Sequence, residues 1–119
     1  MPNIRVGGWI MSIEDMFVWA AKFIPHKCFY EIECDEAFQM VTLLAARLKL
    51  GITYVTYPAG MPKVMIVTQY GEVKDWREGY DPRRLPQFKV GRKDERIREI
   101  LEKDGFEELV FVTSFGPMP

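Results

Sequence analysis

The apolar residues between positions 28 and 114 switch between two spacings, and their order limits the folds open to the chain. Four segments have the spacing and residue types of strands: residues 28–34, 52–57, 63–70 and 109–114. Two have helical spacing: residues 35–50 and 93–103. The resulting order, β-α-β-β-α-β, predicts an α+β fold. We expect a ferredoxin-like sandwich, with four antiparallel strands and two helices on one face.

Cap and turn residues support these boundaries. Asp35 is placed to cap the first helix, and Gly51 to end it in a left-handed conformation. The segment 58–62 contains two prolines and a glycine, and predicts a hairpin between its flanking strands. Gly105 is expected to stop the second helix.

The N-terminal part adds an element in front of this core. Ile4 to Ile10 contains Gly7-Gly8, which predicts an edge strand or an arm. Ser12 caps an extra helix that ends before Pro25. We expect residues 1–119 to form a single domain, with an arm and helix at 1–27. The ferredoxin-like core then occupies 28–114 and includes a long basic loop at 72–92.

Helix 12–24 is apolar on nearly every side, which predicts burial against more than one surface. The predicted strands also lack clean alternation of apolar and polar residues, so both sheet faces should be covered. A second copy of so small a chain would provide that cover. We therefore predict a homodimer, with interface anchors at Phe17, Trp19 and Phe23.

The main functional signal is charge. Residues 74–98 hold nine basic and five acidic residues, a balance of +4 in a chain whose net charge is −1. Aromatic residues lie between the basic ones, and prolines disfavour regular structure there. Basic groups interleaved with aromatics suit phosphates and unpaired bases. The segment predicts a small, non-catalytic nucleic-acid-binding module with a preference for single strands.

The predicted nucleic-acid-binding residues combine both kinds of side chain. Arg83 and Arg84 are expected to contact phosphates, and Trp76 and Tyr80 to stack on bases. The full set is Lys74, Trp76, Arg77, Tyr80, Arg83, Arg84, Lys89, Arg92 and Lys93. Residues 91–93 could also form an anion site at a helix N-terminus, unless Asp94 provides ordinary capping there.

Two other classes stay open. The apolar helix and predicted dimer surface would suit a protein-interaction or inhibitory module. Glu31 and Glu33 share one face of a predicted strand and could hold Mg²⁺ in a phosphodiester enzyme, with His26 as the one candidate base. No catalytic or metal motif emerges, so we predict no catalytic residue, no metal and no cofactor, and an enzyme is the least favoured class.

The remaining sequence features concern the cellular setting. Cys28 and Cys34 lie too far apart along one predicted strand to pair, and we expect both to be buried thiols. Residues 1–11 do not resemble a signal peptide, and no apolar run is long enough to span a membrane. These features predict a cytoplasmic protein. Few Asn and Gln residues beside many charged ones are typical of thermophiles.

Overall fold

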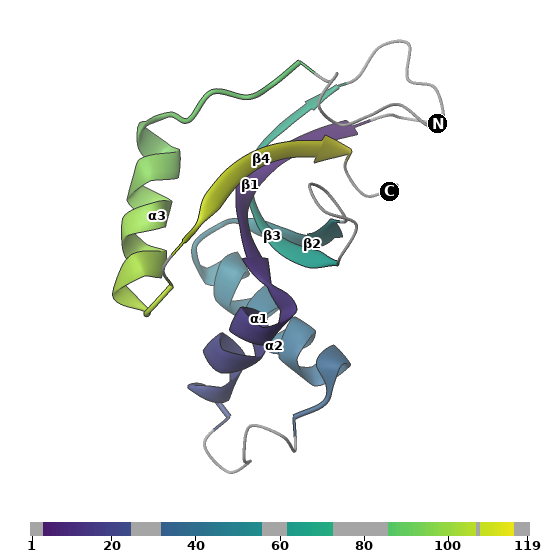
Figure 1. The fold of residues 1–119 in the computed structure, drawn as a ribbon, viewed down its shortest axis with the longest axis vertical. Helices are drawn as coiled ribbons and strands as arrows, with labels where there is room; N and C mark the ends of the chain where they lie inside the picture. Colours follow the sequence, from purple (N-terminus) through teal and green to yellow (C-terminus); the bar gives the residue numbers. More distant parts are fainter. Residues whose placement is uncertain (1–3, 25–31, 56–61, 73–85, 107, 116–119) are drawn as a thin grey trace.

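The computed structural model describes residues 4–24, 32–55, 62–72, 86–106 and 108–115. Within them the chain is α+β, with a four-stranded antiparallel sheet and three helices (Figure 1). The strands are β1 (Ile4–Ser12), β2 (Gly51–Val55), β3 (Lys63–Glu72) and β4 (Val110–Phe115). The helices are α1 (Ile13–Ala21), α2 (Cys34–Arg47) and α3 (Arg92–Lys103).

The sheet has the strand order β2-β3-β1-β4, and every neighbouring pair is antiparallel. The N-terminal segment is therefore a central strand that pairs on both sides, and the prediction of an edge strand or arm is wrong. The register of β1 on β3 shifts between Gly7 and Gly8, which pair with Gln69 and Val67, so that Thr68 is an extra residue of β3. The sheet needs β1 because no other described strand lies between β3 and β4.

The predicted strand at 28–34 is not a strand in its described part. Ile32 and Glu33 are irregular, and α2 begins at Cys34, with Glu33 as its N-cap residue. Asp35 lies in the first turn of α2 rather than at the cap. The six-element order predicted for 28–114 is therefore not the observed one, because the chain supplies its first strand from residues 4–12.

The other elements follow the sequence pattern closely. The side chain of Ser12 accepts a hydrogen bond from the Asp15 amide at 3.0 Å, which confirms the predicted cap. Gly105 ends α3 with a φ of 103°. The left-handed residue after α2 is Lys49, at φ 60°, and not Gly51, which begins β2. The predicted hairpin turn lies mostly outside the described residues.

One hydrophobic core lies between the sheet and the helices. It joins residues of one sheet face to buried positions of all three helices: Trp9, Met11, Val64, Ile66, Met16, Trp19, Val41, Leu44, Ile97 and Leu101. The helices therefore cover the same face of the sheet. Figure 1 shows α1 and α2 together below the strands and α3 on the left.

The opposite sheet face is apolar and also buried. Its side chains form a second cluster: Val6, Ile10, Val55, Met65, Val67 and Val112. All of them are buried within a single chain. The sequence correctly indicates two apolar faces, but the side chains of this face are already buried without a second subunit.

Among the described helices, none is long and apolar enough to cross a lipid bilayer.

Candidate nucleic-acid interface

Three of the nine predicted nucleic-acid-binding residues lie in the described part of the chain. Lys89, Arg92 and Lys93 are all exposed at the start of α3 or just before it. The other six lie outside the described residues: Lys74, Trp76, Arg77, Tyr80, Arg83 and Arg84. The geometry of the site can therefore be built from α3 and from the segment 86–91 that leads into it.

In the first turn of α3, one acidic side chain points into the protein. Asp94 is 2% exposed, and its Oδ2 accepts hydrogen bonds from the Gly91 amide and from Gln69 Nε2, each at 2.7 Å. Gln69 Nε2 also donates to the Lys89 carbonyl oxygen at 2.8 Å. Asp94 thus provides the ordinary capping interaction. Because its carboxylate already occupies the Gly91 amide, the predicted anion site at this helix end does not fit the structure.

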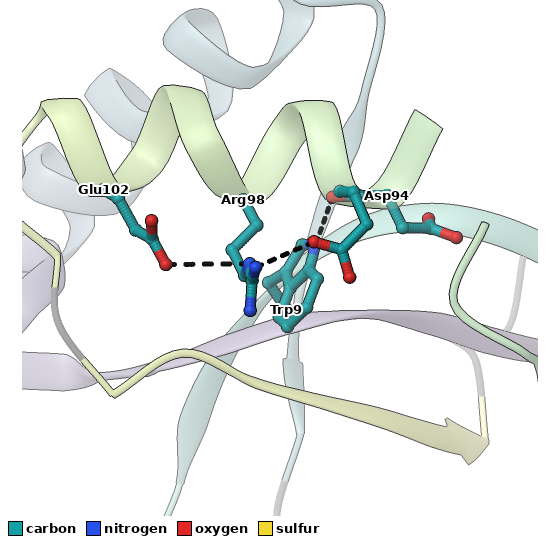
Figure 2. Close-up of polar contacts among 5 residues, drawn as sticks. Trp9, Asp94, Arg98 and Glu102 are labelled. Carbon is teal, nitrogen blue, oxygen red and sulfur yellow. Dashed lines mark hydrogen bonds and ion pairs between the residues drawn. The ribbon is translucent and has the colours of Figure 1, made fainter. Parts of the chain in front are cut away.

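Two of the other three acidic residues of α3 form ion pairs along the helix, and the third, Glu99, is exposed. Arg98 pairs with Glu95 at 2.9 Å and with Glu102 at 3.6 Å (Figure 2). Its guanidinium also lies 5.8 Å from the centroid of the Trp9 ring, and Trp9 Nε1 donates to the Asp94 carbonyl oxygen at 2.9 Å. Trp9 therefore fixes both the position of α3 on the sheet and the side on which these ion pairs lie.

The outward charges at the start of α3 are basic. Arg92, Lys93 and Arg96 are exposed, and so is Lys89 just before the helix. Within the described residues, none of these four groups forms an ion pair. We call these four residues the basic face of α3. With Asp94 buried and Glu95 paired, residues 89–96 present an excess of exposed positive charge, and Glu99 is an exposed acidic residue one turn further along the helix.

The segment 86–91 is fastened to the sheet. Arg5 donates a hydrogen bond to the Pro86 carbonyl oxygen, and its guanidinium lies 4.2 Å from the centroid of the Phe88 ring. The Phe88 amide donates to Thr113 Oγ1 at 3.0 Å. The C-terminal end of the predicted basic loop is therefore held in place from two strands. Sequence reasoning missed Arg5 and Gln69 because their partners lie 81 and 20–25 residues away.

The described residues give little support to the hypothesis of a carboxylate site at Glu31 and Glu33. Glu33 is exposed at the N-cap of α2, and Glu31 and His26 lie outside the described residues. Across the described ranges, no group of three or more His, Cys, Asp or Glu side chains is placed to hold a metal ion. Cys34 is exposed, so the prediction that it is a buried thiol is wrong; Cys28 lies outside the described residues.

The predicted dimer anchors on and after α1 have different environments. Trp19 is 2% exposed and packs edge-to-face on Phe106, with ring centroids 5.4 Å apart. It is therefore a core residue and is not available to a partner. Phe17 is half-buried, and Phe23 is exposed just beyond the helix end. The sequence identified an apolar helix but could not show that Trp19 faces the chain's own core.

Tyr54 on β2 is a residue that sequence reasoning did not single out. Its ring stacks on Phe38 of α2, with centroids 4.4 Å apart and planes at 16°. Partial desolvation of the Tyr54 hydroxyl, its hydrogen bond with Cys34 Sγ (3.6 Å) and the charges of Cys34 and Asp35 raise its pKa to about 12. The alternation of β2 could have placed Tyr54 on the helix-facing side, but not beside Cys34.

We expect Tyr54 to ionise near pH 12 in the folded chain. A raised pKa means that folding favours the protonated hydroxyl, so this stabilisation is complete below pH 10 and is lost as the pH rises toward 12. Phenolate absorbance of the parent minus that of Tyr54→Phe measures the midpoint. Cys34→Ala should lower it, and a parent midpoint at the ordinary tyrosine value would contradict the prediction.

No protein-family model, curated protein or solved structure matches this chain. The arrangement of its own side chains is therefore the basis for a functional proposal.

Proposed function

We propose that this chain is a small nucleic-acid-binding module that contacts phosphate groups through the basic face of α3 and the basic segment before it. The observation that carries the proposal is the excess of exposed basic charge at residues 92–96 of α3. Arg92, Lys93 and Arg96 are exposed there, whereas Asp94 is buried and Glu95 is paired. Nucleic-acid backbones bind surfaces of this kind through their phosphates.

The basic segment extends this surface in sequence. Six further predicted contact residues precede Pro86, and Arg5 and Phe88 hold that point of the chain against the sheet. The aromatic residues Trp76 and Tyr80 support a preference for unpaired bases, which stack on flat side chains. A preference for single strands is therefore part of the proposal.

The ferredoxin-like assignment also stays a proposal. Its first strand would be β1 rather than residues 28–34, and α1 and α2 together would form the first crossover. The antiparallel sheet and its order β2-β3-β1-β4 support this view.

The proposal predicts that Arg92→Ala with Lys93→Ala weakens binding to every nucleic-acid sequence tested. Because each lost phosphate contact releases one counterion fewer, the slope of log K against log salt should fall by about two for duplexes. Binding of labelled single-stranded and duplex oligonucleotides across a salt series measures the change.

Lys103→Ala is the matched control. Lys103 is exposed in the last turn of α3, about 16 Å along the helix from the Arg92 position. Its removal takes away one positive charge without touching the basic face, so the slope should change by much less. Equal losses for both variants would indicate unspecific attraction, and an unchanged slope for the double variant would remove the basic face from the binding site.

A further inference from the structure

Three of the exposed large apolar side chains lie at or beside the β2 edge of the sheet. Leu43 of α2 is 61% exposed, Tyr54 of β2 is 43% exposed and Tyr70 of β3 is 60% exposed. Phe38 stacks on Tyr54 on the helix-facing side. On the opposite side the Tyr70 hydroxyl lies against Gly51, so close that a Cβ there would lie 2.1 Å from it. Both sides of β2 therefore carry exposed apolar surface.

β2 lacks the residues that usually protect the edge of a sheet. It ends the described sheet, and residues 51–55 contain no charged residue and no proline. Proteins commonly protect sheet edges with such residues, because an open edge accepts another strand. β4 at the other edge is also uncharged, with Val110 exposed and residues 112–114 buried. In β2, residues 51–53 are half-buried, Tyr54 is exposed and Val55 is buried. Of the two edges of the described sheet, β2 therefore has the smaller share of buried side chains.

The exposed charges at the two ends of α2 have opposite signs beside the two ends of β2, although half-buried Lys63 of β3 pairs with Val55 at the Tyr54 end. α2 runs antiparallel to β2, because its start contacts Tyr54 through Cys34 and Phe38, and its end leads through Lys49 into Gly51. The exposed acidic residues Glu33 and Asp35 therefore lie near the Tyr54 end. The exposed basic residues Arg47 and Lys49 lie near the Gly51 end.

We propose that β2 pairs antiparallel with β2 of a second copy, about a two-fold axis at Thr53. In this pairing Tyr54 lies opposite Ile52 of the second copy, and the strand edges satisfy each other's backbone groups. The acidic end of one copy then meets the basic end of the other, twice. A two-fold axis gives this match with a second copy of the chain, which is why we assign the edge to self-association rather than to a different protein.

Pairing through β2 is independent of nucleic-acid binding. α3, which carries three of the four residues of the basic face, lies on the side of the molecule away from β2 (Figure 1). A dimer formed at β2 would therefore leave both basic faces open. It also replaces the dimer surface expected from the sequence, since Trp19 and the second sheet face are buried within one chain.

Sedimentation equilibrium of the full chain at tens of micromolar tests the pairing. We expect a species of twice the 13.9 kDa chain mass. Two charge-reversed variants separate this interface from any other: Arg47→Glu with Lys49→Glu, and Glu33→Lys with Asp35→Lys. Each alone places like charges opposite each other at both ends of β2, so its dimer should dissociate about tenfold or more readily.

Mixing the two variants should restore the dimer, because every contact between them again joins opposite charges. The matched control is Arg96→Glu with Lys103→Glu, which reverses two charges on α3 and should leave the dimer unchanged. A monomeric parent, variants that dimerise like the parent, or a mixture that stays monomeric would each overturn the proposal and leave the β2 edge to a different partner.

A measurement on the parent covers the case in which a variant fails to fold. Hydrogen exchange of the amides of residues 51–55 should slow as the protein concentration rises, because pairing protects the edge of β2. Exchange at residues 110–115 of β4 serves as the internal control and should not change. Protection of β2 that is independent of concentration would contradict pairing with a second copy.

Discussion

Replacing Gly8 with alanine is expected to lower the free energy of unfolding by about 3 kcal/mol or more. An added Cβ would lie 1.9 Å from the Ile66 carbonyl oxygen on the neighbouring strand. That atom belongs to the backbone of β3, so it cannot move aside as a flexible side chain can. Because β1 is hydrogen-bonded to strands on both sides, the strain would spread through the whole sheet. Urea unfolding followed by far-ultraviolet circular dichroism measures the loss.

Gly7→Ala is the matched control for this prediction. The added Cβ at position 7 would lie 2.5 Å from Cδ2 of the Phe88 ring. A ring can rotate or shift, so the loss of stability should be smaller and should loosen the segment 86–91 in particular. If Gly8→Ala were no more destabilising than Gly7→Ala, the close approach of β1 to β3 would not be as described.

Trp9→Ala is expected to be among the most damaging truncations of a core side chain. Trp9 is buried, packs edge-to-face on Phe111 at 5.3 Å between centroids, and donates to the Asp94 carbonyl oxygen. Removing a buried tryptophan leaves a cavity and costs roughly 3–5 kcal/mol. The same change takes away the contact that fixes α3 to the sheet. The unfolding free energy and the near-ultraviolet circular dichroism spectrum report the two effects.

Trp9→Phe separates packing from hydrogen bonding. Phenylalanine keeps an aromatic ring in the core but cannot donate to Asp94, so the loss should be smaller, at about 1–3 kcal/mol. A Trp9→Ala variant as stable as Trp9→Phe would mean that the ring does not carry the packing of α3. Nucleic-acid binding by Trp9→Phe should stay close to that of the parent if α3 remains docked.

Periodicity in the sequence was enough to predict most of the secondary structure. The apolar residues at helical spacing in α2, Val41, Leu44 and Ala45, are buried. On α3 the same spacing predicts one face with Ile97, Ile100 and Leu101, of which Ile97 and Leu101 are buried and Ile100 is exposed. These predictions succeed because a helix that buries one face needs apolar residues at helical spacing, which can be read from the sequence. The α+β class follows from the same pattern.

The error in the first strand has an equally local cause. Residues 28–34 alternate like a strand, whereas residues 4–12 contain two adjacent glycines that lower their apparent strand preference. In the structure those glycines serve the close approach of β1 to β3, which depends on strand pairing across some 60 residues. The strand propensity of a short segment cannot show that glycine is required there by a partner strand so far away in the sequence.

The candidate site was likewise predictable from the sequence only in part. The excess of basic residues in 74–98 is visible in the sequence, but the inward turn of Asp94 depends on Gln69. The β2 edge could not be recognised from sequence, because nothing in residues 51–55 indicates that they end a sheet. Which strand is last in the order is decided by tertiary pairing alone.

The position of Arg5 has a consequence for the evolution of this chain. Arg5 is paired with Gly71 near the end of β3 and bonds Pro86, so a single residue joins the points where the chain leaves and rejoins the described fold. For a chain segment that joins two fixed points, the entropy of closure depends only weakly on length, by about 0.6 kcal/mol per doubling. Insertions, deletions or a new composition between these points should therefore be tolerated by the sheet. The same fold can acquire a different ligand preference through changes confined to residues 73–85.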